Sequence, residues 1–454
     1  MNTSTRIMNL FFIGLFLITS VLLIQGTSTP TTERLSVQSP HFTADVILTN
    51  QTIWSDSNVN FNTSIDINGG GNLTIVNSTI TFTNTSGFKL NNNSHLKLIN
   101  SVIMSGFRGV QGTTNGTLDI HESTFTGFVN DVIRLQGNYD VSIDGTVFTN
   151  NLQDAVQVDN AAAVVNITNS RFENIGKDGI NALNTKYFIS NTVFANITDD
   201  GLQIEGNAQL TVRDSLIANT NSGDGIKFAV TSGTITIDNI SITGTGDDGL
   251  QVVGATTTTI TKSKFNTNSE NGFESSLGGP VLINESTFNS NGIRGIELIG
   301  VSSVNITASS FVDNDDVGIF ANNVTSLSVL LSNITHNALG GIYMAVVNSS
   351  EIHVSRFVSN SGFSINATDI GSGSFVDASN NYWGTLNQSQ IQNFGNISIS
   401  PILDESLQIP VTSSATSASS IASTATSDVF FAPIFGAIMS AGFILRFMRK
   451  KQDT

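Results

Sequence analysis

Three stretches of the chain, TVFTNNLQDAVQV (146–158), SRFENIGKDGINA (170–182) and TVFANITDDGLQI (192–204), repeat one arrangement of residues. In each of them a Phe stands third, an Asp ninth and a small residue tenth. STFNSNGIRGIEL (286–298) and SSFVDNDDVGIFA (309–321) keep the Phe and the Gly of the same frame. A spacing of about 23 residues indicates that one supersecondary unit is repeated along the chain.

Two columns of residues follow this repeat. The small position is held by Gly179, Gly201, Gly225, Gly249, Gly272, Gly295, Gly318 and Gly341. The large apolar position is held by Phe125, Phe148, Phe172, Phe194, Ile217, Ile242, Phe265, Phe288, Phe311, Ile334 and Phe357. Between them apolar residues alternate with polar ones, as in Leu118/Ile120, a period that predicts two or three half-buried strands per unit and no helix within 45–400.

Units of this length are too short to enclose a core by themselves, so they must stack. A coil of about 23 residues with short strands, repeated in register, predicts an all-β solenoid, the parallel β-helix. Each strand then pairs with its counterpart one coil later, at a rise of about 4.8 Å, and we expect some 13 or 14 coils (about 65 Å in length). Stacking also predicts that the Phe and Ile column fills the interior.

A column of asparagines marks the later coils. It consists of Asn268, Asn291, Asn314, Asn337 and Asn360. Asn tolerates a left-handed backbone at a turn, and stacked amides form hydrogen bonds along a stack of strands. We therefore expect these residues to sit at turns and to bond to one another from coil to coil.

In these features the chain resembles the large family of right-handed parallel β-helix surface proteins, whose repeats are similar to those of pectate lyases. The resemblance covers about 45–400. Its most specific part is VDASNNYWGTLNQSQIQNFGNISISPIL (376–403), which resembles the closing coil of that family, and IDINGGGNLTIVNSTITF (65–82) is similar to its opening coils. The resemblance implies a right-handed solenoid in which Tyr382 and Trp383 cover the last layer of core.

The two ends of the chain predict a membrane-anchored protein. An apolar run follows Arg6, and a second one (429–445) precedes the basic stretch RFMRKK. A Ser/Thr/Ala tract between 411 and 428 is typical of a stalk. We predict a signal peptide or signal anchor (1–26), a linker (27–44), the β-helix (45–403), a stalk (404–428), a transmembrane helix (429–448) and a cytoplasmic tail (449–454). The β-helix would then lie on the extracellular face of the membrane, at the cell surface.

Composition excludes several classes of function. The net charge of −16 argues against nucleic acid as a partner, because phosphate binding needs clustered Lys and Arg. The absence of cysteine excludes disulfides, thiolate metal sites and cysteine catalysis. The histidines are scattered, so we expect no transition-metal site; they are His41, His95, His121, His336 and His353.

An acidic column accompanies the small position. The residue before it is an acid in six successive coils: Asp131, Asp154, Asp178, Asp200, Asp224 and Asp248. A second acid precedes only two of these, as Asp199 and Asp247. Carboxylates stacked about 5 Å apart repel one another, at near 1 kcal/mol per pair in water. Two interpretations remain open: the acids cap turns and face solvent, or this face binds a cation such as Ca²⁺ or a glycan.

Part of this column also resembles the polygalacturonases, β-helix glycosidases with an Asp on one coil and an Asp pair on the next. That resemblance implies Asp224, Asp247 and Asp248 as acids and Arg294 as the basic residue that binds the substrate. The sequence departs from the pattern where Asn271 stands in place of a His, and where Ile296 stands in place of a Lys. Lys227 and Arg213 are the candidate bases of a lyase or epimerase.

The sequence therefore favours a structural, adhesive or glycan-binding protein over an enzyme. The alternative is a polysaccharide hydrolase or lyase built on the four candidate residues. Sequons for N-glycosylation on the predicted extracellular part include Asn166, Asn196, Asn239, Asn305 and Asn333.

Overall fold

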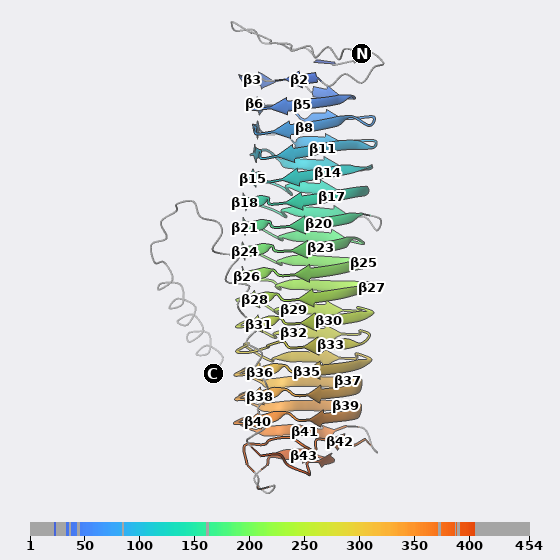
Figure 1. The fold of residues 1–454 in the computed structure, drawn as a ribbon, viewed down its shortest axis with the longest axis vertical. Helices are drawn as coiled ribbons and strands as arrows, with labels where there is room; N and C mark the ends of the chain where they lie inside the picture. Colours follow the sequence, from blue (N-terminus) through green and yellow to red (C-terminus); the bar gives the residue numbers. More distant parts are fainter. Residues whose placement is uncertain are drawn as a thin grey trace, which may run out of the picture. The chain divides into compact units, whose positions relative to one another are not determined.

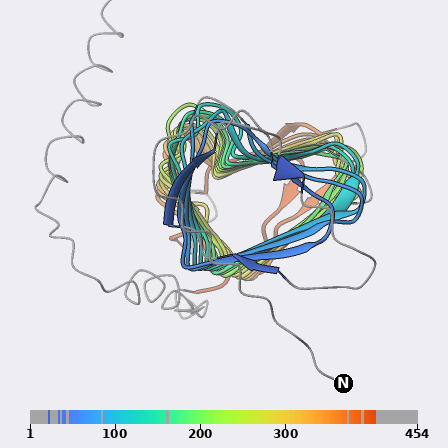
Figure 2. The same cartoon turned by 90° about the horizontal axis from the view of Figure 1, so that it is seen from above.

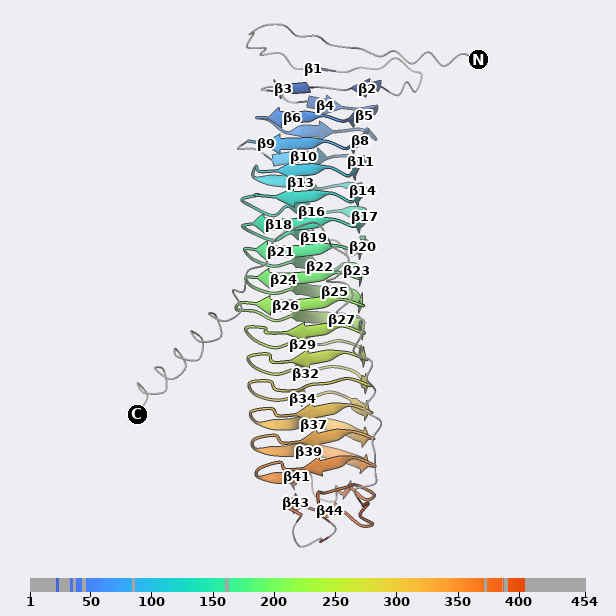
Figure 3. The same cartoon turned by 60° about the vertical axis from the view of Figure 1, so that its left-hand side comes forward.

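The structure, a computed structural model, describes residues 46–83, 86–159, 163–370, 374–385, 387 and 391–404, with the backbone of three short strands between 22 and 42. The described part is a parallel β-solenoid of about 15 coils (Figures 1 and 3), which confirms the predicted fold class. All its strand pairings are parallel. The number of coils exceeds our expectation because the interior column starts earlier, with Val59, Ile80 and Ile103 in register below Phe125.

Three parallel sheets run the length of the stack. The first consists of β1 (Leu22–Leu23), β4 (Val46–Leu48), β7 (Ile65–Ile67), β10 (Ser86–Leu90), β13 (Arg108–Gly112), β16 (Ile133–Leu135), β19 (Val156–Asp159), β22 (Ile180–Leu183), β25 (Leu202–Arg213), β27 (Ile226–Asp238), β29 (Leu250–Val253), β32 (Phe273–Ser276), β34 (Ile296–Ile299), β37 (Val317–Leu330), β39 (Gly340–His353), β41 (Phe363–Asp369) and β43 (Asn393–Gly395).

The second sheet consists of β2 (Glu33–Leu35), β5 (Gln51–Ser55), β8 (Asn72–Val76), β11 (Ser94–Ile99), β14 (Asn115–His121), β17 (Asn138–Asp144), β20 (Val164–Thr168), β23 (Lys186–Ser190), β30 (Thr257–Thr261), β33 (Val281–Asn284), β35 (Ser303–Thr307), β42 (Val376–Asp377) and β44 (Ile397–Ser398). It also includes the C-terminal halves of β25, β27, β37 and β39, because these long strands cross from the first sheet into the second.

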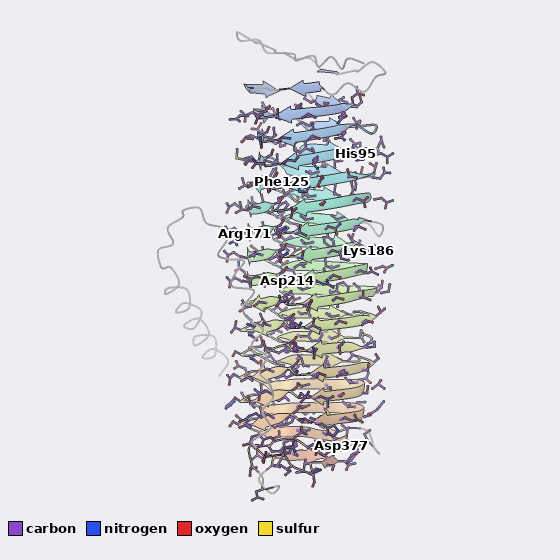
Figure 4. All side chains as sticks on the ribbon, viewed as in Figure 1. His95, Phe125, Arg171, Lys186, Asp214 and Asp377 are labelled. Atoms are coloured by element: carbon purple, nitrogen blue, oxygen red, sulfur yellow. The ribbon has the colours of Figure 1, made fainter. Side chains whose placement is uncertain are left out.

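The third sheet consists of β3 (Gln38–Phe42), β6 (Asn58–Phe61), β9 (Thr79–Phe82), β12 (Val102–Met104), β15 (Thr124–Thr126), β18 (Val147–Asn151), β21 (Arg171–Ile175), β24 (Val193–Ile197), β26 (Leu216–Thr220), β28 (Ser241–Thr243), β31 (Lys264–Asn266), β36 (Ser310–Val312), β38 (Asn333–Thr335) and β40 (Arg356–Val358). Thr287 bridges β31 and β36. Seen along the axis, the coils superimpose on one three-sided outline (Figure 2). Side chains point outward along the whole stack; Arg171 on β21 and Lys186 on β23 lie at opposite edges in Figure 4.

The interior column is made of stacked rings, as the repeat predicts. Phe125, Phe148, Phe172 and Phe194 are fully buried, and their ring centroids are 4.6–5.3 Å apart. This distance matches the spacing of paired strands, so the backbone pairing itself sets the stacking distance. The column ends at Trp383, which is buried and stacks on Phe357 at 4.8 Å, confirming the closing coil.

The asparagine column forms the ladder that we expected. Asn291 donates from its backbone N–H and from Nδ2 to Oδ1 of Asn314, at 3.0 and 3.1 Å. Asn314 repeats both bonds to Asn337 and also donates to the Phe288 carbonyl. The expectation of a left-handed backbone was wrong by one residue: positive φ falls on the preceding position, such as Ser290 (58°) and Asp313 (57°). The ladder residue itself must point inward to reach the next coil.

The predicted signal segment, stalk, transmembrane helix and tail lie outside the described residues. The chain divides into two units, residues 1–415 and 416–454, and the second lies wholly outside them. Within the described part, no helix is long and apolar enough to span a bilayer.

The Asn ladder leads to a prediction for stability. We expect Asn314→Ala to lower the free energy of unfolding by about 2–4 kcal/mol, because the buried N–H of Asn291 loses its acceptor. Urea denaturation of the purified protein measures this change. Asn305→Ala, at an exposed position on β35, is the control and should change stability by less than about 0.5 kcal/mol. Equal losses in the two variants would contradict a stabilising ladder.

Candidate functional site

The acidic column lies on the turn that leads from the third sheet into the first. In the coil around Asp200, β24 ends at Ile197 and β25 begins at Leu202. The glycine that follows the acid in the coils of Asp178, Asp200, Asp224 and Asp248 is required by packing. A Cβ on Gly225, for example, would meet the Gly249 carbonyl oxygen at 2.5 Å and also collide with Ile242. At this position the backbones of consecutive coils lie so close together that only glycine fits. This close contact also holds the preceding acid at the edge of the first sheet.

The aspartates of the column are buried, contrary to the interpretation that they face solvent. Asp154, Asp178, Asp224 and Asp248 are each at most 2% exposed. Their carboxylates do not cap their own turns but accept from the next coil. Asp178 Oδ1 accepts the N–H of Asp200 at 3.1 Å, Asp224 Oδ1 that of Asp248 at 3.0 Å, and Asp248 Oδ1 that of Asn271 at 2.8 Å. The column is thus a continuous ladder of carboxylates.

Burial makes several of these groups unusually weak acids. Desolvation, reinforced by Asp154, raises the pKa of Asp178 to about 7. Desolvation together with Asp200 and Asp247 raises the pKa of Asp224 to about 7. The pKa of Asp248 is raised to about 8, again chiefly by desolvation. Near neutral pH the ladder therefore holds protons that an exposed aspartate would have lost.

The second acids complete two clusters. Asp178, Asp199 and Asp200 bring one oxygen each within 4.8 Å of one another, and so do Asp224, Asp247 and Asp248. We call these groups the first and the second triad. In each triad two members are buried ladder residues, and the third, Asp199 or Asp247, is partly exposed. The two positions at which the sequence adds an acid are thus the positions at which three carboxylates converge.

The triads suit a hard cation better than a transition metal. Their donors are carboxylate oxygens, which Ca²⁺ takes in sets of six to eight, so waters or carbonyl oxygens would supply the rest. Gly223 fits this arrangement, because a Cβ there would lie 2.4 Å from Asp200 Oδ1 and 2.9 Å from Asp199 Oδ1. Glycine at this position lets the acids of the first triad approach the following coil.

Three acids of the column, one of them a member of the first triad, have basic partners. Lys177 Nζ lies 3.2 Å from Asp154 Oδ1 and 3.2 Å from Asp178 Oδ2. Asp131 pairs with Arg134 at 3.3 Å and with Arg108 at 3.7 Å. Of the eight acids singled out by the sequence, six form the column, and Asp199 and Asp247 each precede one of them. Asp131 and Asp154 belong to ion pairs, and the other six form the triads, of which Asp178 also pairs with Lys177.

Arg294, the basic residue of the polygalacturonase pattern, is paired with other acids than those of the second triad. Arg294 pairs with Glu297 and with Asp316, the latter at 3.0 Å, and its guanidinium lies 4.3 Å from the centroid of Phe320. The structure thus brings Asp224, Asp247 and Asp248 together, but Arg294 contacts its own coil and the next one. Glu274 extends the acidic region, and desolvation raises its pKa.

Sequence reasoning missed an aromatic patch on the outer face of the first sheet. The rings of Phe320 and Tyr343 stack outside the core with centroids 5.4 Å apart and planes within 2°. Phe363 packs against Tyr343, and the exposed Phe394 packs edge-on against Phe363. The signal was present in the repeat, because Phe320 and Tyr343 each follow a core isoleucine and must point outward.

The glycosylation candidates differ in access. Asn166, Asn196 and Asn305 are exposed, whereas Asn239 and Asn333 are partly buried. Asn239 donates to Asp214 Oδ1 at 2.5 Å.

Comparison with known proteins agrees with the architecture. The family model for the right-handed beta helix region matches residues 21–185, 108–260 and 154–311, which together span more than half of the chain. The chain belongs to the right-handed β-helix family. A search of curated proteins found no match.

Two solved structures show similar folds at very low identity. One is the A-module of the mannuronan C-5 epimerase AlgE6 of Azotobacter vinelandii, with 9% identity, a TM-score of 0.35, and coverage of 81% of this chain and 91% of that chain. The other is a double mutant of the periplasmic alginate epimerase AlgG, with 10% identity, a TM-score of 0.35, and coverage of 75% and 79%. At these scores neither likeness carries a conclusion about function.

The buried acids lead to a prediction of pH dependence. A carboxyl whose pKa is raised by folding stabilises the folded state fully below its unfolded pKa, near 4, and this contribution is lost as the pH rises through the folded pKa. For Asp224 and Asp248, with folded pKa values of about 7 and about 8, we expect the free energy of unfolding to fall from about pH 5 to 8. Each group contributes about 1.4 kcal/mol per pH unit to this slope.

Chemical denaturation over this pH range, in the presence of chelator, checks the slope. Asp248→Asn should reduce the slope by the contribution of one titrating group, about 1.4 kcal/mol per pH unit. Asn271 holds the same position one coil later, which shows that the ladder accommodates an amide. Asp140→Asn, at an exposed site on β17, is the matched control and should keep the slope. A slope in Asp248→Asn equal to that of the unmodified protein would rule out this assignment.

Proposed function

We propose that this chain is a glycan-binding rod of the cell surface, which presents the outer face of its first sheet to a polysaccharide. The proposal rests on the column of outward side chains that follows this sheet from coil to coil, with aromatic rings at one end. A linear polymer lying along the axis would meet one of these side chains at each rise of about 4.8 Å.

The column is defined by the strand register. It consists of Lys89, Gln111, Arg134, Gln157, Asn181, Gln203, Lys227, Gln251, Glu274, Glu297, Phe320, Tyr343, Asn366 and Phe394. Most of these side chains are amides or charged groups of the kind that bond to sugar hydroxyls, and none is aliphatic. We call this column the binding stripe.

The aromatic end of the binding stripe supports sugar binding most directly. Phe320 and Tyr343 are stacked with parallel planes and are only partly exposed, and the guanidinium of Arg294 lies over the Phe320 ring. The exposed parts of these rings would offer apolar contact to the C–H groups of a sugar, while the neighbouring Arg294 and Glu297 would supply polar contacts for its hydroxyls.

The location of the protein is also part of the proposal. The apolar segments at the two ends and the Ser/Thr-rich tract support secretion through 1–26, a stalk at 404–428 and a single C-terminal transmembrane anchor at 429–448. The rod would then stand on the extracellular face with its aromatic end towards the stalk in chain order. Its partners would be the membrane and extracellular glycans.

A second candidate, a polysaccharide-active enzyme, is favoured by one observation. Asp224 and Asp248 hold protons near neutral pH and converge with Asp247, so an acid stands beside a further carboxyl at the second triad. This pairing suits general acid catalysis at a glycosidic oxygen. Against it, both Asp224 and Asp248 already bond to the backbone of the next coil.

We also propose that the triads bind Ca²⁺. Three carboxylates within 4.8 Å repel one another unless protonated or neutralised by a cation, and oxygen donors are those that Ca²⁺ selects. A cation bound there would tie consecutive coils together and would act on stability rather than on the binding stripe.

Glycan binding is tested at the aromatic patch. We expect Phe320→Ala/Tyr343→Ala to weaken binding of an acidic oligosaccharide about tenfold, roughly 1.4 kcal/mol, because the apolar contact surface of the two rings is lost. Isothermal titration of the purified full chain with oligogalacturonate measures this. Phe188→Ala removes an exposed ring from the second sheet and should leave the affinity unchanged.

The same incubations separate binding from catalysis. We expect the polymer to be recovered with its length and composition unchanged, as measured by chromatography and proton NMR. Cleavage or conversion by the unmodified protein that disappears in Asp247→Asn/Asp248→Asn would overturn the binding proposal in favour of the enzyme.

Calcium binding is tested by thermal unfolding. We expect added Ca²⁺ at about 100 times its dissociation constant to stabilise the protein by about 2.7 kcal/mol per occupied site, and chelator to reverse the shift. Asp199→Asn/Asp247→Asn should abolish the shift, since it removes the third carboxylate of each triad. Asp313→Asn, at an exposed turn outside the triads, should retain it. A melting temperature indifferent to chelator would count against Ca²⁺.

A further inference from the structure

Three of the few cationic side chains of this acidic chain line one cavity. The cavity lies on the outer face of the first sheet, between β10, β13 and β16, and has a volume of about 380 Å³. Lys89, Arg108 and Arg134 line it together with polar neighbours that include Gln111, Thr113 and Gln136. Its volume falls within the range of small-ligand sites, roughly 300–1,000 Å³. A chain with 35 acidic and 19 basic residues thus places three cations around one hollow.

The acids around this cavity satisfy the cations only in part. Lys89 Nζ lies 3.6 Å from Asp66, while Arg134 and Arg108 share Asp131 at 3.3 and 3.7 Å. Charge-assisted bonds between such groups are usually about 2.7–2.9 Å long, so these pairs are loose. Two carboxylates face three cations, and two guanidinium groups with five N–H donors each share a single carboxylate.

Arg108 carries a donor that has no acceptor among the described residues. Its Nε is buried and makes no hydrogen bond with the described residues. The guanidinium also lies 5.0 Å from the centroid of Phe107, which restricts the ways in which it can turn. A buried N–H without an acceptor is costly, and an oxyanion in the cavity would supply one.

A buried, hydrogen-bonded tyrosine lies beneath the cavity. Tyr139 is buried beneath it, donates to the Leu90 carbonyl at 3.1 Å and accepts the N–H of Thr114 at 3.3 Å. A side chain at Gly112 would collide with the Tyr139 hydroxyl, so glycine at this place makes room for Tyr139 beneath the cavity. The packing of these coils therefore fixes the backbone on which the cavity lies.

We propose that this cavity, the basic pocket, binds a carboxylate or sulfate group carried by a sugar residue. The inference rests on the proposed glycan binding and names its substrate class as an acidic polysaccharide. Lys89 and Arg134 belong to the binding stripe, and Arg134 lies eight coils from Phe320 along it, roughly 38 Å. One polymer could therefore place a charged group in the pocket and a ring on the aromatic patch.

The test is isothermal titration of the full chain with oligogalacturonate, a sulfated oligosaccharide and a neutral cello-oligosaccharide. We expect the acidic probes to bind at least tenfold more tightly than the neutral one. Lys89→Gln/Arg134→Gln should remove this preference. Lys186→Gln, on the exposed face of the second sheet, is the matched control and should keep it.

Asp131→Asn provides a readout that a structural role would not give. It removes the carboxylate that competes for Arg108 and Arg134, so affinity for the acidic probes should rise several-fold. Asn271 holds the corresponding place in a later coil, so the ladder tolerates the amide, and a melting curve of the variant checks that it folds. Unchanged or weaker binding in this variant would overturn the pocket.

The outcomes separate this inference from the proposed function. If oligosaccharides bind and only the Phe320→Ala/Tyr343→Ala variant binds them more weakly, the basic pocket is wrong and glycan binding stands. If monomeric galacturonate or inorganic sulfate binds through Lys89 and Arg134 while no oligosaccharide binds, the pocket stands and the glycan-binding function is wrong. If no probe binds, both are overturned.

Discussion

The structure depends on one constraint, the parallel pairing of each strand with its counterpart one coil later. From β4 to β41 the register shifts at Gly206/Asn207 and at Tyr343/Ala345 but is otherwise kept along the coils, so most side chains lie against the residue that holds the same position in the neighbouring coils. Apolar residues gain from this arrangement, as the stacked phenylalanines show. Stacked polar residues stabilise the fold only if each can both donate and accept a hydrogen bond along the axis. Serine satisfies this condition, since Ser263 N–H donates to Ser286 and Ser286 N–H donates to Ser309.

The aspartate ladder meets the same condition incompletely. Asn314 offers both a donor and an acceptor, so its ladder closes with neutral groups. An ionised aspartate offers only acceptors, and the backbone N–H of the next coil uses one of its oxygens. The remaining oxygen and the charge stay in a buried place, which is why burial raises the pKa of Asp224 and Asp248. A proton and a cation are alternative ways to neutralise that charge, so the two would compete.

The sequence predicted what the repeat itself controls. The Phe column and the Asn ladder follow from periodicity and were expected, and the family resemblance implied that Trp383 closes the core. The burial of the aspartates was not, because spacing places a residue at a turn without saying whether the turn faces inward. The partners of Arg294 could not be predicted for a related reason. Asp316 lies 22 residues away and becomes a neighbour only through the exact coil length.

Function in such a fold should be sought where coils differ, because the interior requires them to be alike. An outward position is free of packing, so its identity can change from Arg134 to Glu297 to Phe320 without disturbing the stack. The acid pairs at Asp199 and Asp247 and the basic pocket around Arg108 are departures of the same kind. These departures lie at successive levels along one edge and face of the first sheet, in the order basic, acidic and aromatic. A surface that varies along the axis and repeats at the height of one coil is suited to a ligand that is itself long and repetitive.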